Sequence, residues 1–331
     1  MIIIIYFLAL IGDKYGWIQV FNENLELVSS FQAHTSWINR IKQLPNGLVV
    51  TSSSDSYALV KMWDPTNNAW NLVRTYSDHT PNYQVWALEY LGNNTIASAS
   101  ASGVIQIWST ETAQTIKSIY TGSSAVSLKL LSNGYHLACG LGDGYIYIYN
   151  INDESLVQAL MGHTSAVNDL PLLSNDLLAS SSGDGTICIW NLTTYTNKFT
   201  LTGHTNQIYG LKQISNDVLA STSYDTTIKF WNITSGSLIR TLTGHASYIQ
   251  WSIDLWNSQT LLTGSYDKTI KVWNVSTGEL IKTIQTNLTI DALTVLNSNS
   301  SLSTTTSITT PTTSSYSIPI GALSKFLIFL F

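Results

Sequence analysis

A sequence unit repeated in tandem with a nearly constant period restricts this chain to a small set of folds. Three copies follow one another between Gly162 and Asn274. Each copy begins with Gly-His, has an Asp six residues before a Trp and ends in Trp-Asn, at Trp190, Trp231 or Trp273, so the period is 41 or 42 residues. A fixed period of this size indicates a fold in which one small unit is stacked many times.

The unit continues over most of the chain in less regular copies. Equivalent aromatic positions, 41 to 45 residues apart, give seven copies: Phe21, Trp63, Trp108, Tyr149, Trp190, Trp231 and Trp273. Each copy contains short runs of alternating apolar and polar residues, separated by turn sequences such as Asn-Gly and Ser-Asn-Asp. These runs predict antiparallel strands joined by hairpins, and no stretch shows the apolar period of a helix. We therefore expect an all-β protein.

The repeated residues resemble those of the WD-repeat (Trp-Asp repeat) β-propeller family, in which Gly-His, a turn Asp and a closing Trp recur at this spacing. The resemblance implies a seven-bladed β-propeller over residues 1–296, with four antiparallel strands in each blade. A ring of this kind leaves no sheet edge open when the C-terminal strand pairs with the N-terminal strands. Proteins of this family are scaffolds with varied partners, so the resemblance also implies a binding function.

The two ends of the repeat region predict how the ring closes. The first copy lacks its first strand, and residues 288–296 are similar to the first strands of other copies, so we expect them to pair with the N-terminal strands. Alignment of the Gly-Asp dipeptide at Gly12 with the one at Gly183 places residues 6–10 in the second-strand position.

The terminal segments leave alternatives open. Residues 1–10 could instead be the apolar part of a signal peptide, and residues 301–306 could then take the second-strand position. Residues 297–317 are almost wholly Ser, Thr, Asn and Pro, which predicts a disordered linker or a glycosylated stalk. Residues 318–331 form an apolar tail that is too short to span a membrane but resembles a lipid-anchor signal, so any membrane contact would be made by this tail. The location stays open between cytoplasmic, the default of the family, and cell-surface or secreted.

Charge and composition argue against several classes of function. The chain has 331 residues with 15 Lys and Arg, 20 Asp and Glu and a net charge of −5, and its basic residues form no cluster, so no nucleic-acid partner is expected. Cys139 and Cys188 lie in apolar runs of different copies, which predicts two buried thiols. The sequence has no metal-ligand or nucleotide-binding motif, so we expect no metal site and no cofactor.

Each regular copy carries His, Ser or Thr, Asp and Trp at spacings that differ by at most one residue between copies. The three sets are His163, Ser180, Asp184 and Trp190; His204, Ser221, Asp225 and Trp231; and His245, Thr263, Asp267 and Trp273. His, Ser and Asp also form hydrolase triads, but three triads in one ring would be redundant and no nucleophile-elbow motif accompanies them. The family resemblance implies a buried hydrogen-bond chain instead, so we predict no catalytic residue and no enzyme. The earlier copies depart from the pattern, with Ser102 in one Asp position.

The positions left after these structural ones predict a binding face. In the family, partners dock at the start of each first strand and just before the turn Asp. Those positions here hold Trp37, Asn39, Trp86, Val126, Asn168, Tyr209, Trp251 and Asp291, with Gly183, Tyr224 and Tyr266 before the turn Asp. Exposed Trp and Tyr are enriched at binding hot spots, although these aromatic side chains could also turn inward and pack between blades. We predict a scaffold that binds a protein or peptide on this face. The alternative is a secreted or surface-tethered recognition domain on a Ser/Thr-rich stalk.

Overall fold

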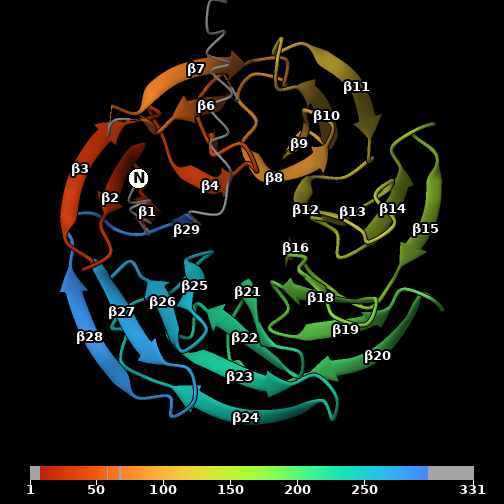
Figure 1. Ribbon diagram of the computed structural model, residues 1–331. Coiled ribbons are helices and arrows are strands. Elements are labelled where there is room, and N and C mark those ends of the chain that lie inside the picture. The colour runs from red at the N-terminus through yellow and green to blue at the C-terminus, as the bar shows by residue number, and fades with distance from the viewer. Residues whose placement is uncertain (1–7, 58, 67–68, 297–331) are drawn as a thin grey trace, which may run out of the picture. The chain divides into compact units, whose positions relative to one another are not determined.

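Seven antiparallel sheets surround a central axis in the computed structural model (Figure 1). The structure describes residues 8–296, apart from residues 58, 67 and 68. The described part contains no α-helix, and four strands form the path of each sheet, so the predicted seven-bladed propeller is confirmed. The predictions made for residues 1–7 and 297–331, including the linker or stalk and the tail, lie outside the described residues. Residues 8–12 hold the second-strand position of the first sheet, so the alternative that residues 301–306 take it is wrong.

We number the sheets as blades in chain order and give the strands of each from the axis outward. Blade 1 consists of β29 (Ala292–Leu296), β1 (Leu8–Gly12), β2 (Trp17–Phe21) and β3 (Leu27–Gln32). Blade 2 consists of β4 (Ile38–Gln43), β5 (Val49–Ser53), β6 (Val60–Asp64) and β7 (Asn71–Tyr76). Blade 3 consists of β8 (Val85–Gly92), β9 (Thr95–Ser100), β10 (Val104–Ser109) and β11 (Thr115–Tyr120).

The remaining blades follow the same order. Blade 4 consists of β12 (Ala125–Leu130), β13 (His136–Leu141), β14 (Ile146–Asn150) and β15 (Leu156–Leu160). Blade 5 consists of β16 (Val167–Asp169), β18 (Leu177–Ser182), β19 (Ile187–Asn191) and β20 (Thr196–Leu201), with the short β17 (Leu172–Leu173) also paired to β18. Blade 6 consists of β21 (Ile208–Ser215), β22 (Val218–Ser223), β23 (Ile228–Asn232) and β24 (Ser237–Leu242). Blade 7 consists of β25 (Ile253–Asn257), β26 (Thr260–Gly264), β27 (Thr269–Asn274) and β28 (Leu280–Gln285).

Blade 1 closes the ring, because its innermost strand comes from the other end of the repeat region. β29 pairs antiparallel with β1, from Leu8 opposite Leu296 to Gly12 opposite Ala292. The predicted closure is therefore confirmed, and β1 is paired on both sides, with β29 and with β2, so it has no free edge.

The register of the second strand differs from the prediction by two residues. Ala9 lies opposite Phe21, just as Leu178 lies opposite Trp190, so the second-strand position holds residues 8–12 rather than 6–10. The aligned Gly-Asp dipeptides are not equivalent, because the backbone of Asp13 closes the turn that Ser182 closes in blade 5. A shift of two residues keeps the same side chains on the same face of the sheet, which is why the apolar pattern alone did not reveal it.

The core is divided among the contacts between blades. Seven clusters of buried apolar side chains occur, and each combines residues of two adjacent blades. Trp231 of blade 6, for example, is 1% exposed and lies in one cluster with Ile187 and Ile189 of blade 5. Replacing a buried Trp of this kind by Ala typically costs about 3–5 kcal/mol of stability. Each blade therefore needs a neighbour on both sides, which only a closed ring supplies.

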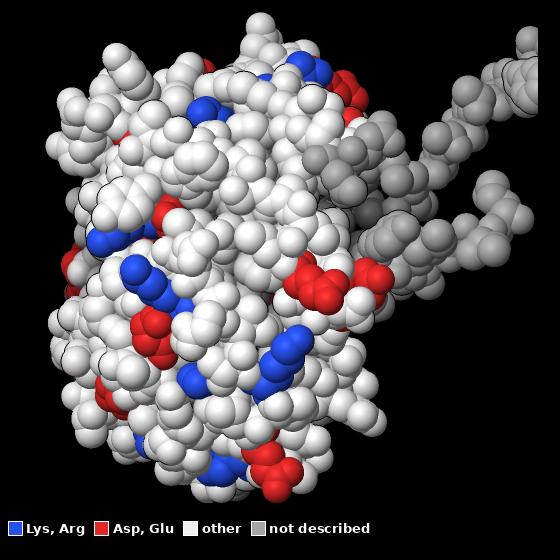
Figure 2. Space-filling view, turned by 90° about the vertical axis from the view of Figure 1, so that its left-hand side faces the viewer, with Lys and Arg blue, Asp and Glu red and all other residues white. Residues whose placement is uncertain are grey.

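Charged side chains are sparse on the outside of the ring. On the side shown in Figure 2, Lys and Arg side chains are scattered over a mostly uncharged surface, several of them beside Asp or Glu. This side therefore offers no basic patch of the kind that binds nucleic acid. Nothing in the described residues forms a helix long and apolar enough to cross a membrane.

Candidate binding surface

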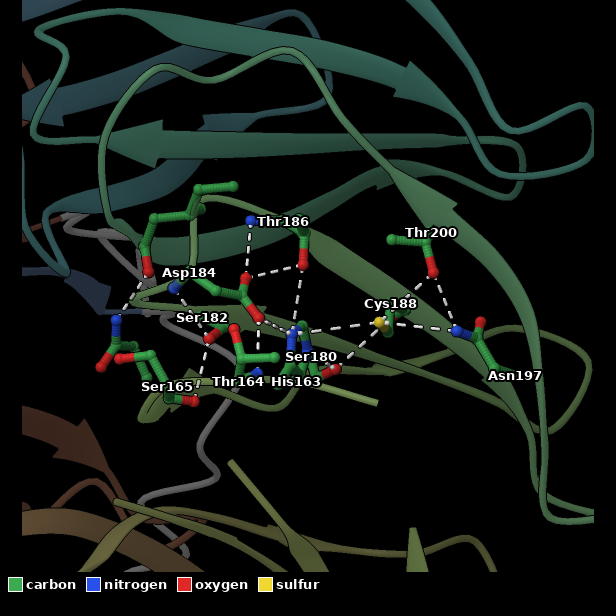
Figure 3. Close-up of polar contacts among 12 residues, drawn as sticks. His163, Thr164, Ser165, Ser180, Ser182, Asp184, Thr186, Cys188, Asn197 and Thr200 are labelled. Atoms are coloured by element: carbon green, nitrogen blue, oxygen red, sulfur yellow. Dashed lines mark hydrogen bonds and ion pairs between the residues drawn. The ribbon is translucent and has the colours of Figure 1, made fainter. Parts of the chain in front are cut away.

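A buried hydrogen-bond chain crosses blade 5 from its Gly-His loop to its third strand (Figure 3). His163 Nδ1 lies 3.0 Å from Asp184 Oδ2, and His163 Nε2 lies 2.7 Å from Ser180 Oγ. The indole Nε1 of Trp190 donates to the same Ser180 oxygen at 2.8 Å. Asp184 also accepts from the backbone N–H and the hydroxyl of Thr186. The structure thus brings the four residues of this set together.

The other two regular sets have the same geometry. The His–carboxylate and His–hydroxyl distances are 2.6 and 2.8 Å in the set of His204, Ser221, Asp225 and Trp231. They are 2.8 and 2.9 Å in the set of His245, Thr263, Asp267 and Trp273. In both sets the Trp donates to the hydroxyl at 2.8 Å. Blade 2 has a fourth complete set, formed by His34, Thr51, Asp55 and Trp63.

Burial decides what these sets can do chemically. Ser180 is 0% exposed and its hydroxyl already binds both His163 and Trp190, so a substrate cannot reach it. Burial lowers the pKa of His163, which favours the neutral imidazole. A neutral ring that donates from Nδ1 to Asp184 accepts at Nε2, and the Ser oxygen then accepts from the indole. Every group in the chain is satisfied, which is how a buried polar network stabilises a single packing arrangement.

Blades 1, 3 and 4 depart from this arrangement at the positions where the sequence departs, and blade 1 has Phe21 in the Trp position. In blade 3, Ser102 stands in the Asp position, and His79 Nδ1 has no hydrogen-bond partner among the described residues. In blade 4, Cys139 and Tyr149 occupy the positions of Ser180 and Trp190. Cys139 and Cys188 are both buried and unpaired, as predicted.

Six aromatic side chains form a continuous row on the face where the innermost strands begin. In order they are Trp251, Tyr209, Tyr224, Tyr248, Tyr266 and Trp37, which we call the aromatic path. The centroids of successive rings are 5.0, 4.6, 4.5, 4.1 and 6.2 Å apart. Trp37 is 40% exposed and the other five are partly buried. The path extends over residues of blades 6, 7 and 2, so it depends on the closed ring.

A cavity of about 680 Å³ lies beside the aromatic path at the same end of the central channel. Trp37, Trp86, Tyr209, Tyr224 and Trp251 line it together with Ser, Asn and Gln side chains. Its described lining contains no Lys, Arg, Asp or Glu. We call it the aromatic-side cavity. Its surface combines flat apolar rings with uncharged hydrogen-bonding groups, which suits a ligand of the same character.

The repeats match the family model described as WD domain, G-beta repeat (WD40). The match covers residues 25–64, 70–109, 154–191, 195–232 and 236–274, more than half of the chain. This chain belongs to the WD40-repeat family. Each matched repeat begins near the outermost strand of one blade and ends with the third strand of the next, so consecutive blades interlock.

Comparison with other proteins adds the fold alone. The crystal structure of the computationally designed Ika8 protein aligns with a TM-score of 0.67 and 24% sequence identity, over 86% of this chain and 85% of that one. No curated protein sequence matches the chain significantly. WD40 propellers commonly serve as protein-interaction scaffolds.

Four of the residues predicted for the binding face of this WD40 propeller are buried, namely Asn39, Val126, Asn168 and Asp291. Asn39 donates to the backbone oxygen of Val85 at 3.0 Å, and Asn168 donates to that of Ile208 at 2.8 Å, so each amide links its blade to the next. Asp291 is 1% exposed. Asn39 and Asn168 therefore link neighbouring blades and also line the aromatic-side cavity, whereas Asp291 does not line it.

Trp251 and Arg40 lie across the central channel of the WD40 ring. The Arg40 guanidinium lies 4.1 Å from the centroid of the Trp251 ring, and both side chains donate to the backbone oxygen of Asn168 at 3.0 Å. Burial lowers the pKa of Arg40 to about 10, so it is still cationic at neutral pH. Trp251 lines the aromatic-side cavity and also a second cavity at the other end of the channel, so it separates the two.

Sequence reasoning missed one member of the aromatic path in this WD40 chain. Tyr248 lies three residues after His245, and Trp37 lies three residues after His34, so the two positions are equivalent. The prediction named Trp37 at that position but, in the copy that contains Tyr248, named Trp251, three residues further on. The spacing from the Gly-His motif was the signal that could have identified Tyr248.

Proposed function

We propose that this protein is a non-catalytic scaffold that binds an uncharged peptide segment, or a loop of a partner protein, on the aromatic path and in the aromatic-side cavity. The observation that most supports this proposal is the unbroken row of six aromatic rings beside a cavity whose described lining has no charged side chain. Trp and Tyr supply large contact areas with little loss of side-chain entropy, so they dominate the energy of many interfaces.

The polar groups around the rings support a peptide as the ligand. Gln250 Nε2 donates to the hydroxyl of Tyr224 at 2.5 Å, and the Tyr209 hydroxyl donates to Gln207 Oε1 at 2.9 Å. These contacts fix the orientation of both rings. Amide and hydroxyl side chains also bind the N–H and C=O groups of a peptide backbone, while the ring faces accept apolar side chains.

The alternative of a hydrolase has less support, because the hydroxyls of Ser180, Ser221 and Thr263 are buried and already bound to His and Trp. A nucleophile needs room for the reacting carbonyl and a nearby oxyanion donor. The hydrogen-bonded sets of His, Ser or Thr, Asp and Trp instead stabilise the blades that carry the aromatic path.

Peptides selected from a random display library test the proposal. Wild-type protein is used for selection, and affinities are then measured for wild type and for a triple variant with Trp37→Ala, Tyr209→Ala and Tyr266→Ala. We expect the triple variant to lose at least about tenfold in affinity, because hot-spot aromatics each contribute on the order of 2 kcal/mol.

Tyr135→Ala is the matched control. Tyr135 is 44% exposed and lies in the β12–β13 turn, at the opposite end of the strands from the aromatic path. Trp37→Ala alone serves as a milder variant if the triple variant unfolds. The proposal would be contradicted if wild type and Trp37→Ala bound the peptides with equal affinity, or if Tyr135→Ala lost as much affinity as the aromatic-path variants. Selection of strongly charged peptides only would also contradict it.

A further inference from the structure

The second cavity, of about 470 Å³, lies at the other end of the central channel and is lined by charged side chains. One residue from each blade, in the innermost strand or, in blade 5, just after it, contributes to its wall at an equivalent position. In blade order these are Thr294, Lys42, Glu89, Lys129, Pro171, Lys212 and Asp254. Lysines thus stand on blades 2, 4 and 6 and project into one space. We call it the lysine-side cavity.

The charge in this cavity is concentrated compared with the rest of the chain. Lys42, Lys129, Lys212 and Arg40 line it, so four of the 15 Lys and Arg residues of the chain are gathered here. Its lining has three carboxylates, those of Glu89, Asp169 and Asp254, which gives a formal charge of 4 − 3 = +1 in a chain whose net charge is −5.

The carboxylates of the cavity already have partners on every oxygen. Glu89 accepts Lys42 on one oxygen and Lys129, at 3.0 Å, on the other. Asp254 accepts Lys212 at 2.6 Å on Oδ1 and the backbone N–H of residue 295 on Oδ2. Asp169 accepts the backbone N–H groups of residues 170 and 211. Little acceptor capacity is left for a cation to bind.

The lysines, in contrast, retain free donor capacity. Each ammonium carries three N–H donors. Among the residues that the structure describes, Lys42, Lys129 and Lys212 each pair with one carboxylate group. Their side chains are 31%, 30% and 37% exposed, whereas those of Glu89 and Asp254 are 6% and 15% exposed. The groups that face the open space are therefore donors.

The buried carboxylates hold the ammonium groups in position. Burial acts to raise the pKa of Glu89, but the charges and hydrogen bonds of Lys42 and Lys129 outweigh it, so the pKa lies below its usual value and the group is ionised. A carboxylate fixed between two lysines restricts two flexible side chains before any ligand arrives. Such preorganisation lowers the entropic cost of binding.

We propose that the lysine-side cavity binds a small molecule with two or more phosphate groups. Three ammonium groups from alternate blades would contact its oxygens, and the Arg40 guanidinium, stacked on Trp251, would lie at the inner end of the site. Lysine binds phosphate as a point charge, whereas planar carboxylates are recognised best by an arginine fork. The Arg40 fork is occupied by the backbone oxygens of residues 39 and 168, which favours phosphate over carboxylate.

Calorimetric titration with inorganic tripolyphosphate in about 0.15 M salt, an ionic strength at which exposed charges are screened beyond roughly 8 Å, tests the proposal. We expect saturable binding of one molecule per chain, stronger than that of citrate or of sulfate. Lys129→Met and Lys212→Met are each expected to weaken it at least about tenfold, because hydrogen bonds to charged groups are the strong ones. In Lys129→Met, Glu89 still pairs with Lys42. In Lys212→Met, Asp254 still accepts a hydrogen bond from the backbone N–H of residue 295. Neither substitution therefore leaves a carboxylate without a partner.

Lys117→Met is the matched control, since the Lys117 side chain is 28% exposed and also faces a carboxylate but lies outside the cavity. If a lysine variant unfolds, Lys212→Met combined with Asp254→Asn removes the pair without leaving a lone charge. The proposal would be overturned by binding that does not saturate or by equal binding to Lys117→Met and Lys212→Met. It would also be overturned if citrate bound as tightly as tripolyphosphate, or if only a phosphopeptide bound. The triple variant of the aromatic path should still bind tripolyphosphate, so the two proposals fail separately.

Discussion

His79 Nε2 lies 2.7 Å from the Oγ of Ser98, so blade 3 keeps half of the contact that the regular blades make with both nitrogens of this ring. The other nitrogen, Nδ1, is buried without a partner among the described residues. Burial lowers the pKa of His79 to about 4. One Ser in place of an Asp thus leaves a neutral, incompletely bonded imidazole within an otherwise satisfied series of networks.

Ser102→Asp should stabilise the protein by about 1–2 kcal/mol, since a carboxylate at this position can accept from the buried Nδ1 of His79. The turn has the required shape, because Gly103 and Gly185 follow the two equivalent positions with φ of 78° and 81°. Urea unfolding at pH 7 measures the gain. Ser102→Asn, which has the same size without the charge, should gain less, and a destabilised Ser102→Asp would show that the carboxylate does not reach the imidazole.

The pH dependence of stability should reflect His79. Its folded pKa of about 4 lies below the unfolded value of 6.5, so the unfolded chain takes up a proton first as the pH falls. The contribution of this group to stability is therefore full above pH 6.5 and is lost as the pH falls to about 4, with a total on the order of 3 kcal/mol. The difference between wild type and His79→Gln, measured by unfolding across this range, isolates the effect. A constant difference would contradict it.

Asp225→Ala should destabilise the protein by about 1–3 kcal/mol, because the carboxylate accepts from His204, from the backbone of Thr205 and twice from Thr227. Removing it leaves these donors in a site that is largely closed to water. Urea unfolding compares it with Asp217→Ala, whose carboxylate is exposed and accepts from a surface Thr. Similar losses in the two variants would contradict a special role for the buried set.

Asp291→Asn should stabilise the protein at high pH. Burial raises the pKa of Asp291 to about 7, above the usual 3.8, and neither carboxyl oxygen has a hydrogen-bond partner among the described residues. The folded state therefore favours the protonated form, and wild-type stability is lost as the pH rises from about 4 to 7. The Asn variant has no such loss, so its advantage should grow to roughly 2–4 kcal/mol at pH 8.

Unfolding of both proteins in urea at pH 4.5 and pH 8 measures this difference. The same substitution at Asp143, in the exposed β13–β14 turn, is the control for the loss of one negative charge. An equal gain at both pH values would show that the Asp291 carboxyl is not responsible.

Truncation before Ala292 should open the ring, because it removes β29 and exposes the edge of β1 and the apolar cluster shared by blades 1 and 2. We expect a lower melting temperature and association through the free edge, measured by thermal unfolding and light scattering. A chain that ends at Ser301 keeps β29 and is the control. A monomer with unchanged melting temperature after the shorter truncation would contradict ring closure by this strand.

Local pattern was enough to predict seven copies of short antiparallel strands, and the family resemblance implied the buried sets. The spacings from His163 to Ser180, Asp184 and Trp190 recur from copy to copy, and all four residues belong to one blade. Short-range periodicity carries this information because neighbouring strands are joined by tight hairpins. The closing role of residues 292–296 was also visible, because that segment repeats the pattern of a first strand without a blade of its own.

Contacts between blades determined everything else. The burial of Asn39 and Asp291, the row of rings from Trp251 to Trp37 and the convergence of three lysines all involve residues of different blades. A period of 41 or 42 residues states which positions are equivalent, but not how far the strands around the channel approach one another or which side chains meet there. Those distances follow from packing seven blades around one axis, a condition that no single repeat contains.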